Sequence, residues 1–144
     1  MPDHKLFIFI CRAQARRDIA ALSETGEAEI ARVALRSKRF ELSSENCDIL
    51  TSPTDGEKET AKSFARHLGL GDPIEIPWLN EPDVQGYIIA NGFLRFSEKA
   101  KLVIIIEKPV LVKIAAFCEQ PSHDLHSGDT FILRYPGGRL ERLR

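Results

Sequence analysis

The sequence predicts an α/β protein, a three-layer α/β/α sandwich around a mixed sheet that is mostly parallel. Two runs have the composition of strands that are buried on both faces of a sheet: residues 5–10, which are apolar after Lys5, and residues 102–106, which are apolar throughout. Segments with apolar residues at helical spacing alternate with strand-like segments, and this order builds layered sheets. No repeat or linker interrupts the 144 residues. We therefore expect a single domain over residues 1–144, long enough to bury its own core.

The first half of the chain is predicted to hold two strands and two helices. After the strand at residues 5–10, Ser23 or Thr25 can accept a hydrogen bond from the free N–H groups that begin a helix. A short strand at residues 48–51 leads to a second helix at residues 57–68, which ends before Gly69. The apolar faces expected to be buried are Ile30, Val33, Ala34 and Leu35 in the first helix, and Ala61, Phe64, Ala65 and Leu68 in the second.

The second half of the chain continues the alternation. Residues 73–77 begin and end with proline, which restricts this extended segment to an edge of the sheet. Residues 83–96 are expected to contain a helix. After the strand at residues 102–106, Pro109 suits the first turn of another helix. Residues 130–143, with Pro136-Gly137-Gly138 as the turn, predict a β-hairpin with arms at 130–135 and 139–143.

Charge and cysteine content limit the classes of function. The chain has 20 basic and 21 acidic residues, so no overall field draws it to nucleic acid or to a membrane surface. Its longest apolar run, residues 102–106, is far shorter than the roughly 20 residues that span a bilayer. Cys11, Cys47 and Cys118 are odd in number and far apart, which favours free thiols in the cytoplasm and no metal site. We expect no cofactor, and we leave open both a protein partner and a homo-oligomer.

Three segments, in order, resemble the motifs of a known superfamily. The first strand runs into Cys11-Arg12-Ala13; Leu22-Ser23-Glu24-Thr25-Gly26 follows; and Thr51-Ser52-Pro53 precedes Thr60-Ala61. They are similar to the histidine phosphatase (phosphoglycerate mutase-like) motifs Arg-His-Gly, Leu-Thr-x-x-Gly and Ser-Ser-Pro-x-x-Arg-x-x-x-Thr-Ala. The resemblance covers nearly the whole chain and is strongest to the short phosphohistidine phosphatase branch. It implies the phosphoglycerate mutase-like fold.

The resemblance also implies where a phosphate pocket would lie. In the family, two arginines and two histidines line this pocket, and one histidine becomes phosphorylated. Arg12 matches the first arginine, but Ala13 stands at the nucleophilic histidine, Gly56 at the second arginine and Glu107 at the second histidine. Lys58, close to Gly56, could supply a cation without the planar fork of arginine. The resemblance therefore implies a pocket that has lost the family's reaction.

The resemblance also bears on the four histidines and on Glu107. None of the four histidines (His4, His67, His123 and His126) lies at a position of the family's two, and we interpret them as surface residues. A carboxylate at Glu107 near Arg12 predicts an ion pair in place of a bound phosphate. The alternative is that Glu107 faces solvent or pairs with Lys108 or Lys113.

A cysteine mechanism is the competing enzyme hypothesis. Cys11 and Arg17 satisfy Cys-x5-Arg directly after a buried strand, a pattern similar to that of cysteine-based tyrosine phosphatases. In that chemistry a thiolate attacks phosphorus inside a loop of backbone N–H groups. The loop here lacks a glycine to turn its N–H groups inward, and Asp18 opposes thiolate formation. Otherwise Cys11 is a small buried residue at the end of a strand.

The preferred hypothesis is a pseudophosphatase, a non-catalytic binding or regulatory module. Trp78-Leu79 and residues 93–96 are candidate apolar contact surfaces. The alternative is an active phosphatase for a phosphoprotein or a small phosphoester. It would work either with Glu107 as a base beside Arg12 or through Cys11.

Overall fold

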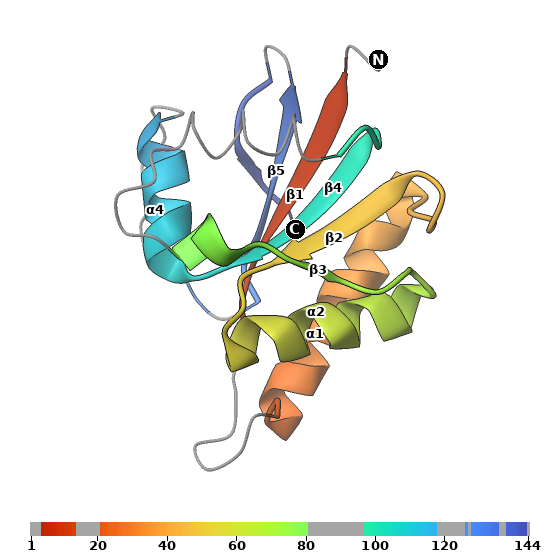
Figure 1. The fold of residues 1–144 in the computed structure, drawn as a ribbon, viewed down its shortest axis with the longest axis vertical. Helices are drawn as coiled ribbons and strands as arrows, with labels where there is room; N and C mark the ends of the chain where they lie inside the picture. Colours follow the sequence, from red (N-terminus) through yellow and green to blue (C-terminus); the bar gives the residue numbers. More distant parts are fainter. Residues whose placement is uncertain are drawn as a thin grey trace.

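A computed structural model describes residues 4–13, 21–80, 97–117, 126, 128–135 and 138–143 of the chain. Strands and helices alternate through most of this part (Figure 1). In chain order the elements are β1 (Lys5–Cys11), α1 (Glu24–Ser37), the 3-10 helix η1 (Lys38–Phe40), β2 (Cys47–Thr51), α2 (Asp55–Leu68), β3 (Ile74–Glu75), the 3-10 helix η2 (Pro77–Asn80), β4 (Lys101–Ile106), α4 (Lys108–Phe117), β5 (Thr130–Tyr135) and β6 (Glu141–Arg142).

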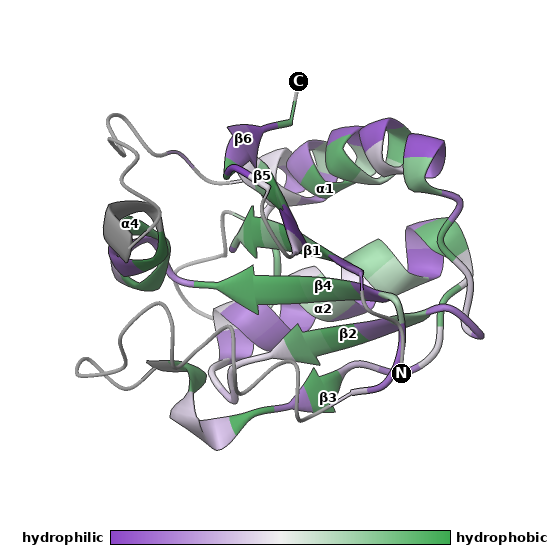
Figure 2. Ribbon diagram, turned by 90° about the horizontal axis from the view of Figure 1, so that it is seen from above, coloured by the Kyte–Doolittle hydropathy of each residue, from purple (hydrophilic) through white to green (hydrophobic). Residues whose placement is uncertain are grey.

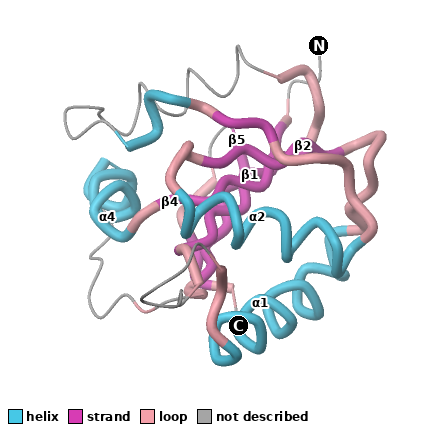
Figure 3. Tube along the Cα trace, turned by 60° about the horizontal axis from the view of Figure 1, so that its bottom comes forward, coloured by secondary structure: helices cyan, strands magenta, loops and turns pink. Residues whose placement is uncertain are grey.

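The strands form one six-stranded sheet in the order β3-β2-β4-β1-β5-β6. Strands β1, β4, β2 and β3 run parallel, whereas β5 is antiparallel to β1 and β6 is antiparallel to β5. Helices α1 and α2 lie beside each other on one side of the sheet, and α4 lies on the other side (Figures 1 and 3). The predicted α/β class, with a mixed and mostly parallel sheet between helices, is confirmed.

Strand β1 shows why an unbroken apolar run is needed at the centre of this sheet. Its side chains alternate between two cores: Leu6, Ile8 and Ile10 pack beneath α1 and α2, whereas Phe7 and Phe9 pack toward α4. Every residue of β1 is buried. Figure 2 shows the same contrast, with hydrophobic strands β1 and β4 between helices that are hydrophilic on their outer sides. A single polar residue in such a strand would face one core or the other.

The ends of α1 and α2 follow local sequence signals. Ser23, rather than Thr25, caps α1, and its hydroxyl accepts a hydrogen bond from the N–H of Gly26 at 3.0 Å. Gly69 ends α2 with a left-handed backbone, φ 65°, which glycine adopts without steric cost. Both helix ends therefore lie where their capping residues predict.

Several expectations for individual elements need correction. Leu35 is 65% exposed, because the buried stripe of α1 runs through Ile30, Val33 and Ala34 to Ser37 and leaves Leu35 beside it. Leu79 is fully buried and Trp78 packs against the α4-side core, so this pair is not an exposed apolar surface. The second arm of the hairpin is only Glu141–Arg142.

Two further points concern the limits of the described chain. The helix expected at residues 83–96, and the candidate contact surface at 93–96, lie outside the described residues. No helix within the described ranges is both long and apolar enough to cross a membrane.

Candidate functional site

The carboxyl ends of three parallel strands meet at one edge of the sheet. Cys11 is in register with Ile106, and Thr51 with Ile105, so β1, β4 and β2 end side by side. The N–H of Arg12 donates a hydrogen bond to the Ile106 carbonyl at 3.1 Å, which holds the chain beyond β1 against the end of β4. Ligands of open α/β sheets bind at this edge. The sequence-predicted pocket residues all follow these strands.

Ala13 is tied to the first turns of α2. Its N–H donates to Thr60 Oγ1 at 3.0 Å, and this hydroxyl donates to the Gly56 carbonyl at 2.7 Å. Thr60 is fully buried and Ala13 is 2% exposed. The Ala13 methyl group is part of the apolar core beneath α1 and α2. Position 13 therefore contributes to packing and carries no group that could attack phosphorus.

Arg12 lies across the start of α2 and pairs with Glu57. Its Nε is 3.6 Å from Glu57 Oε1, an ion-pair distance that is too long for a hydrogen bond. The Arg12 side chain is 53% exposed, whereas that of Glu57 is 0% exposed. A Cβ atom added to Gly56 would lie 2.8 Å from Arg12 Nη1. The absence of a side chain at position 56 thus gives the guanidinium its place.

The Glu57 carboxyl is buried with only part of its hydrogen-bonding capacity used. Thr54 Oγ1 donates to Oε2, but Oε1 has no donor within the described part of the chain. Burial raises the pKa of Glu57; the charge of the neighbouring Glu107 and a hydrogen bond to its carboxyl also raise it, whereas its own backbone N–H and Arg12 lower it. The Glu57 carboxyl therefore lies close to both the Arg12 guanidinium and the Glu107 carboxyl.

The expected ion pair between Arg12 and Glu107 is not present. Among the described residues, the acidic partner of Arg12 is Glu57. Glu107 precedes α4, where its carbonyl accepts hydrogen bonds from the N–H groups of Val110 and Leu111. Glu57 lies in the first turn of α2, next to Gly56, which Arg12 covers. Glu57 is therefore the carboxylate that pairs with the guanidinium. The signal that the sequence offered was Thr54-x-x-Glu57, a pattern that places a glutamate side chain back over the start of a helix.

Lys58 does not add a cation to the Arg12 site. Its Nζ lies 3.5 Å from Glu75 Oε1, at the end of edge strand β3. Lys58 therefore ties α2 to the edge of the sheet. Around the Glu57 carboxyl, the described structure brings together the Arg12 guanidinium and the Glu107 carboxyl.

The structure argues against Cys11 as a nucleophile. Its side chain is fully buried in the α4-side core with Phe9 and Ile106. Burial, reinforced by the charge of Asp129, raises the pKa of Cys11 to about 12, with Lys108 and Arg142 acting weakly in the other direction. A thiol of this kind stays protonated at neutral pH and is a poor nucleophile. Arg17, its proposed partner, lies outside the described residues.

One described histidine lies nearer to this edge than the sequence indicated. His126 is exposed and precedes β5 in a turn in which its N–H donates to Asp129 Oδ2 at 2.8 Å. Gly128, in the same turn, donates to the Cys11 carbonyl at 3.2 Å. No local motif marks this proximity; it follows from the antiparallel pairing of β5 with β1. His67, in the last turn of α2, is exposed, and His123 is outside the described residues.

No group of three or more potential metal ligands occurs among the described His, Cys, Asp and Glu residues. The chemistry available at the strand edge is therefore that of a half-exposed arginine beside two carboxyls, the buried Glu57, whose pKa is raised, and the half-buried Glu107. This arrangement can exchange a proton near a cation. It also places negative charge where an anion would have to enter.

Comparisons with known proteins identify the fold through structure. No family model matches the chain, and no curated protein matches it in sequence. The protein histidine phosphatase SixA, complexed with tungstate, has a TM-score of 0.73 at 17% identity over 89% of this chain and 86% of that one. A phosphoglycerate mutase from Plasmodium falciparum has a TM-score of 0.62 at 15% identity over 98% and 89%. A phosphoserine phosphatase from Entamoeba histolytica has a TM-score of 0.63 at 14% identity over 97% and 95%.

Proposed function

We propose that this chain, which has the phosphoglycerate mutase-like histidine phosphatase fold, is a pseudophosphatase that acts as a non-catalytic binding or regulatory module. The observation that carries the proposal is the arrangement at the strand edge. A buried Glu57 carboxyl contacts Glu107 and pairs with Arg12, and a core alanine occupies the position of the nucleophile. Each of these features works against transfer of a phosphoryl group.

Position 13 carries no nucleophile for the family's reaction. The family's reaction needs an uncharged imidazole that attacks phosphorus and becomes phosphorylated. Position 13, which the motif resemblance aligns with that imidazole, carries a methyl group packed in the core. The described histidines belong to other segments, namely His4 before β1, His67 in the last turn of α2 and His126 before β5. Of these, only His126 belongs to a turn that contacts the end of β1.

The charges beside Arg12 also oppose the binding of a phosphate. A phosphoryl group in transfer is stabilised by cations placed around its oxygen atoms. Here one arginine faces two carboxyls, and Lys58 pairs with Glu75. A phosphate dianion that approaches Arg12 must displace Glu57 from its partner and meet the charge of the carboxyl pair. The site therefore favours its own internal ion pair over a bound phosphate.

Two finer assignments belong to the same proposal. We place the protein in the cytoplasm, which the buried free thiols of Cys11 and Cys47 support. We also propose a protein partner as the ligand of the module, because the altered pocket leaves binding as the function of the retained fold.

A second candidate function rests on one specific observation. Glu57 is a carboxyl of raised pKa beside an arginine, and such groups serve as acid or base catalysts in many active sites. In this version the pocket hydrolyses a phosphoester without a histidine nucleophile, with Arg12 holding the phosphate. It predicts activity that is lost in both Glu57→Gln and Arg12→Gln.

The experiment is a p-nitrophenyl phosphate assay of the parent and of two multiple variants. The revertant carries Ala13→His, Gly56→Arg, Glu107→His and Glu57→Gln; the last change is included because an arginine at 56 displaces Arg12 from Glu57. The matched control carries the same changes at positions 56, 57 and 107 as the revertant, but Ala13→Asn in place of Ala13→His. We expect an inactive parent, a measurable rate in the revertant and none in the control. A parent with robust activity would show that the reaction survives.

A further inference from the structure

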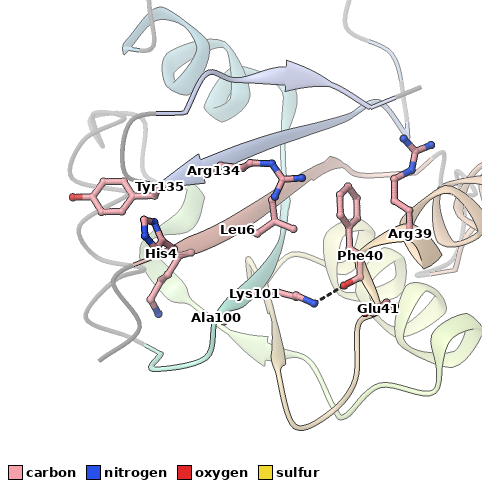
Figure 4. A pocket seen from close by; sticks show the side chains of 10 residues that line it. His4, Leu6, Arg39, Phe40, Glu41, Ala100, Lys101, Arg134 and Tyr135 are labelled. Carbon is pink, nitrogen blue, oxygen red and sulfur yellow. Dashed lines mark hydrogen bonds between the residues drawn. The ribbon is translucent and has the colours of Figure 1, made fainter.

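A recess of about 560 Å³ lies at the edge of the sheet opposite to the one that holds Arg12. It is formed where β1 and β4 begin, where β5 ends and where η1 leaves α1 (Figure 4). Cationic and apolar side chains alternate around it. Its lining includes Leu6, Arg39, Phe40, Lys101, Arg134 and Tyr135.

The register of the sheet places two of the cations on one face. Leu6 is paired with Lys101 on β4 and with Arg134 on β5. Side chains that are in register on adjacent strands point to the same face, so Lys101 and Arg134 flank Leu6 beneath α1 and η1. Neighbouring strands are about 4.8 Å apart, which puts their Cα atoms roughly 10 Å from each other. Two long cationic side chains can both reach one anionic group across that distance.

The wall of the recess is held in an unusual backbone conformation. Glu41, directly after η1, has φ 52° and ψ 51° and is the one non-glycine residue of positive φ in the described ranges. Its N–H donates to the Lys38 carbonyl, and its carbonyl accepts from Asn46 Nδ2 at 3.0 Å. Such conformations cost free energy and are often found at ligand sites. This turn sets Arg39 and Phe40 over the end of the sheet.

The charge of the recess is positive although the whole chain is nearly neutral. Arg39, Lys101 and Arg134 line it, against Glu41 as the acidic residue of its lining, and the Nε of Arg39 also donates to the Arg36 carbonyl at 3.0 Å. None of the ion pairs within the described part of the chain involves Arg134. Figure 4 shows its guanidinium directed toward Leu6 and Phe40, with Lys101 donating to the Phe40 carbonyl. Lys5 also lines the recess, but its ammonium group donates to the carbonyls of Ser97 and Lys99.

We propose that this recess binds a small organic anion whose phosphate or carboxylate group lies between Arg134, Lys101 and Arg39. The apolar part of the ligand rests on the floor made by Leu6 and Phe40. A concave basic site on a chain of net charge −1 suits a compact anion better than nucleic acid, which needs an extended basic surface. The proposal is independent of the altered pocket at the other edge, which holds Arg12.

The test is a titration followed by amide chemical shifts in NMR, with phenyl phosphate, inorganic phosphate and phenylacetate as probes. We expect saturable shifts at Leu6, Phe40, Lys101 and Arg134, with phenyl phosphate binding more tightly than inorganic phosphate. Saturation by phenyl phosphate alone identifies a phosphate ligand, and saturation by phenylacetate as well identifies a site for either anion. Shifts confined to residues 12, 56 and 107, or no saturation with any of the three probes, would overturn the proposal.

Single substitutions distinguish binding at this recess from binding at arginines elsewhere on the protein. Arg134→Gln should weaken phenyl phosphate binding roughly tenfold, since it removes a charge-assisted hydrogen bond. Arg39→Gln should weaken binding in the same direction and serves if Arg134→Gln folds poorly. Arg32→Gln, at an exposed position of α1, should leave the affinity unchanged. Equal affinity in the parent, Arg134→Gln and Arg39→Gln, or tighter binding of a single-stranded oligonucleotide to the same residues, would contradict the assignment.

Discussion

Glu57→Gln should make the protein more stable at neutral pH. The parent buries this carboxyl completely, gives Oε1 no hydrogen-bond donor among the described residues, and holds Arg12 Nε no closer than 3.6 Å. A charged group left in this state costs about 1–3 kcal/mol. Glutamine has the same shape, its carbonyl can still accept from Thr54, and its amide N–H can donate to Glu107. We therefore expect the free energy of unfolding to rise by about 1–3 kcal/mol at neutral pH.

The size of this gain should depend on pH in a definite direction. Burial raises the pKa of Glu57 above its ordinary value of 4.5, so the folded protein binds this proton more tightly than the unfolded chain. The stabilising contribution of the proton is complete below the ordinary pKa and is lost as the pH rises through the raised pKa. The difference between Glu57→Gln and the parent should thus be smallest near the acid end and largest at about pH 8.

The measurement is urea unfolding followed by circular dichroism at several pH values. Glu59→Gln is the matched control, because Glu59 lies on the same helix, is partly exposed and pairs with Lys62 at 3.5 Å. It should change stability by less than about 0.5 kcal/mol at every pH. If Glu57→Gln instead destabilised the protein at neutral pH, the charged form of Glu57 would be the one that the fold requires, and the reasoning above would be wrong.

Three further predictions concern the fold and the thiol. Iodoacetamide should leave Cys11 unmodified in the folded protein at about pH 8, because burial raises its pKa to about 12; peptide mass mapping checks this, and rapid labelling would reopen a thiolate mechanism. Ser23→Ala should lower the free energy of unfolding by about 1 kcal/mol through loss of the bond to Gly26, whereas an unchanged urea midpoint would mean that α1 does not depend on its cap. Phe64→Ala should lower it by about 3–5 kcal/mol, since this fully buried ring lies between α2 and the sheet; a loss below about 1 kcal/mol, measured in the same way, would contradict that packing.

The strands were predictable because their sequence carries the physical cause of their burial. A parallel strand with helices on both sides must be apolar on both faces, and residues 6–10 and 102–106 satisfy that requirement without a break. The start of α1 was predictable to within two residues, because Ser23 and Thr25 are both capping residue types; the structure shows that Ser23 is the cap. Leu35 was not predictable, because four apolar residues span more than one helical face and only tertiary contacts decide which of them is buried.

The positions of the strand-edge residues were predictable, but their partners were not. Arg12 directly follows β1 and Glu107 directly follows β4, and these two strands pair in register. The order of the elements in the sequence therefore indicated that both residues lie at one edge of the sheet. The partner of Arg12 depends on the start of α2, where Gly56 gives the guanidinium room and Glu57 faces it. Spacing along the chain contains no information on that geometry. The recess at Arg134 depends in the same way on strand register and on the backbone of Glu41.

The most direct measurement of the central claim is the intact mass of the protein after incubation with phosphoramidate, a donor of phosphoryl groups to histidine, under alkaline conditions that preserve phosphohistidine. When the modified peptides are mapped, the account predicts no phosphoryl group at the strand edge of the parent, because Ala13 offers no imidazole at the end of β1. A phosphoryl group on the exposed His4 or His67 leaves this prediction unchanged. A phosphorylated side chain mapped to the strand edge that holds Arg12, or to His126 in preference to the exposed His67, would contradict the account.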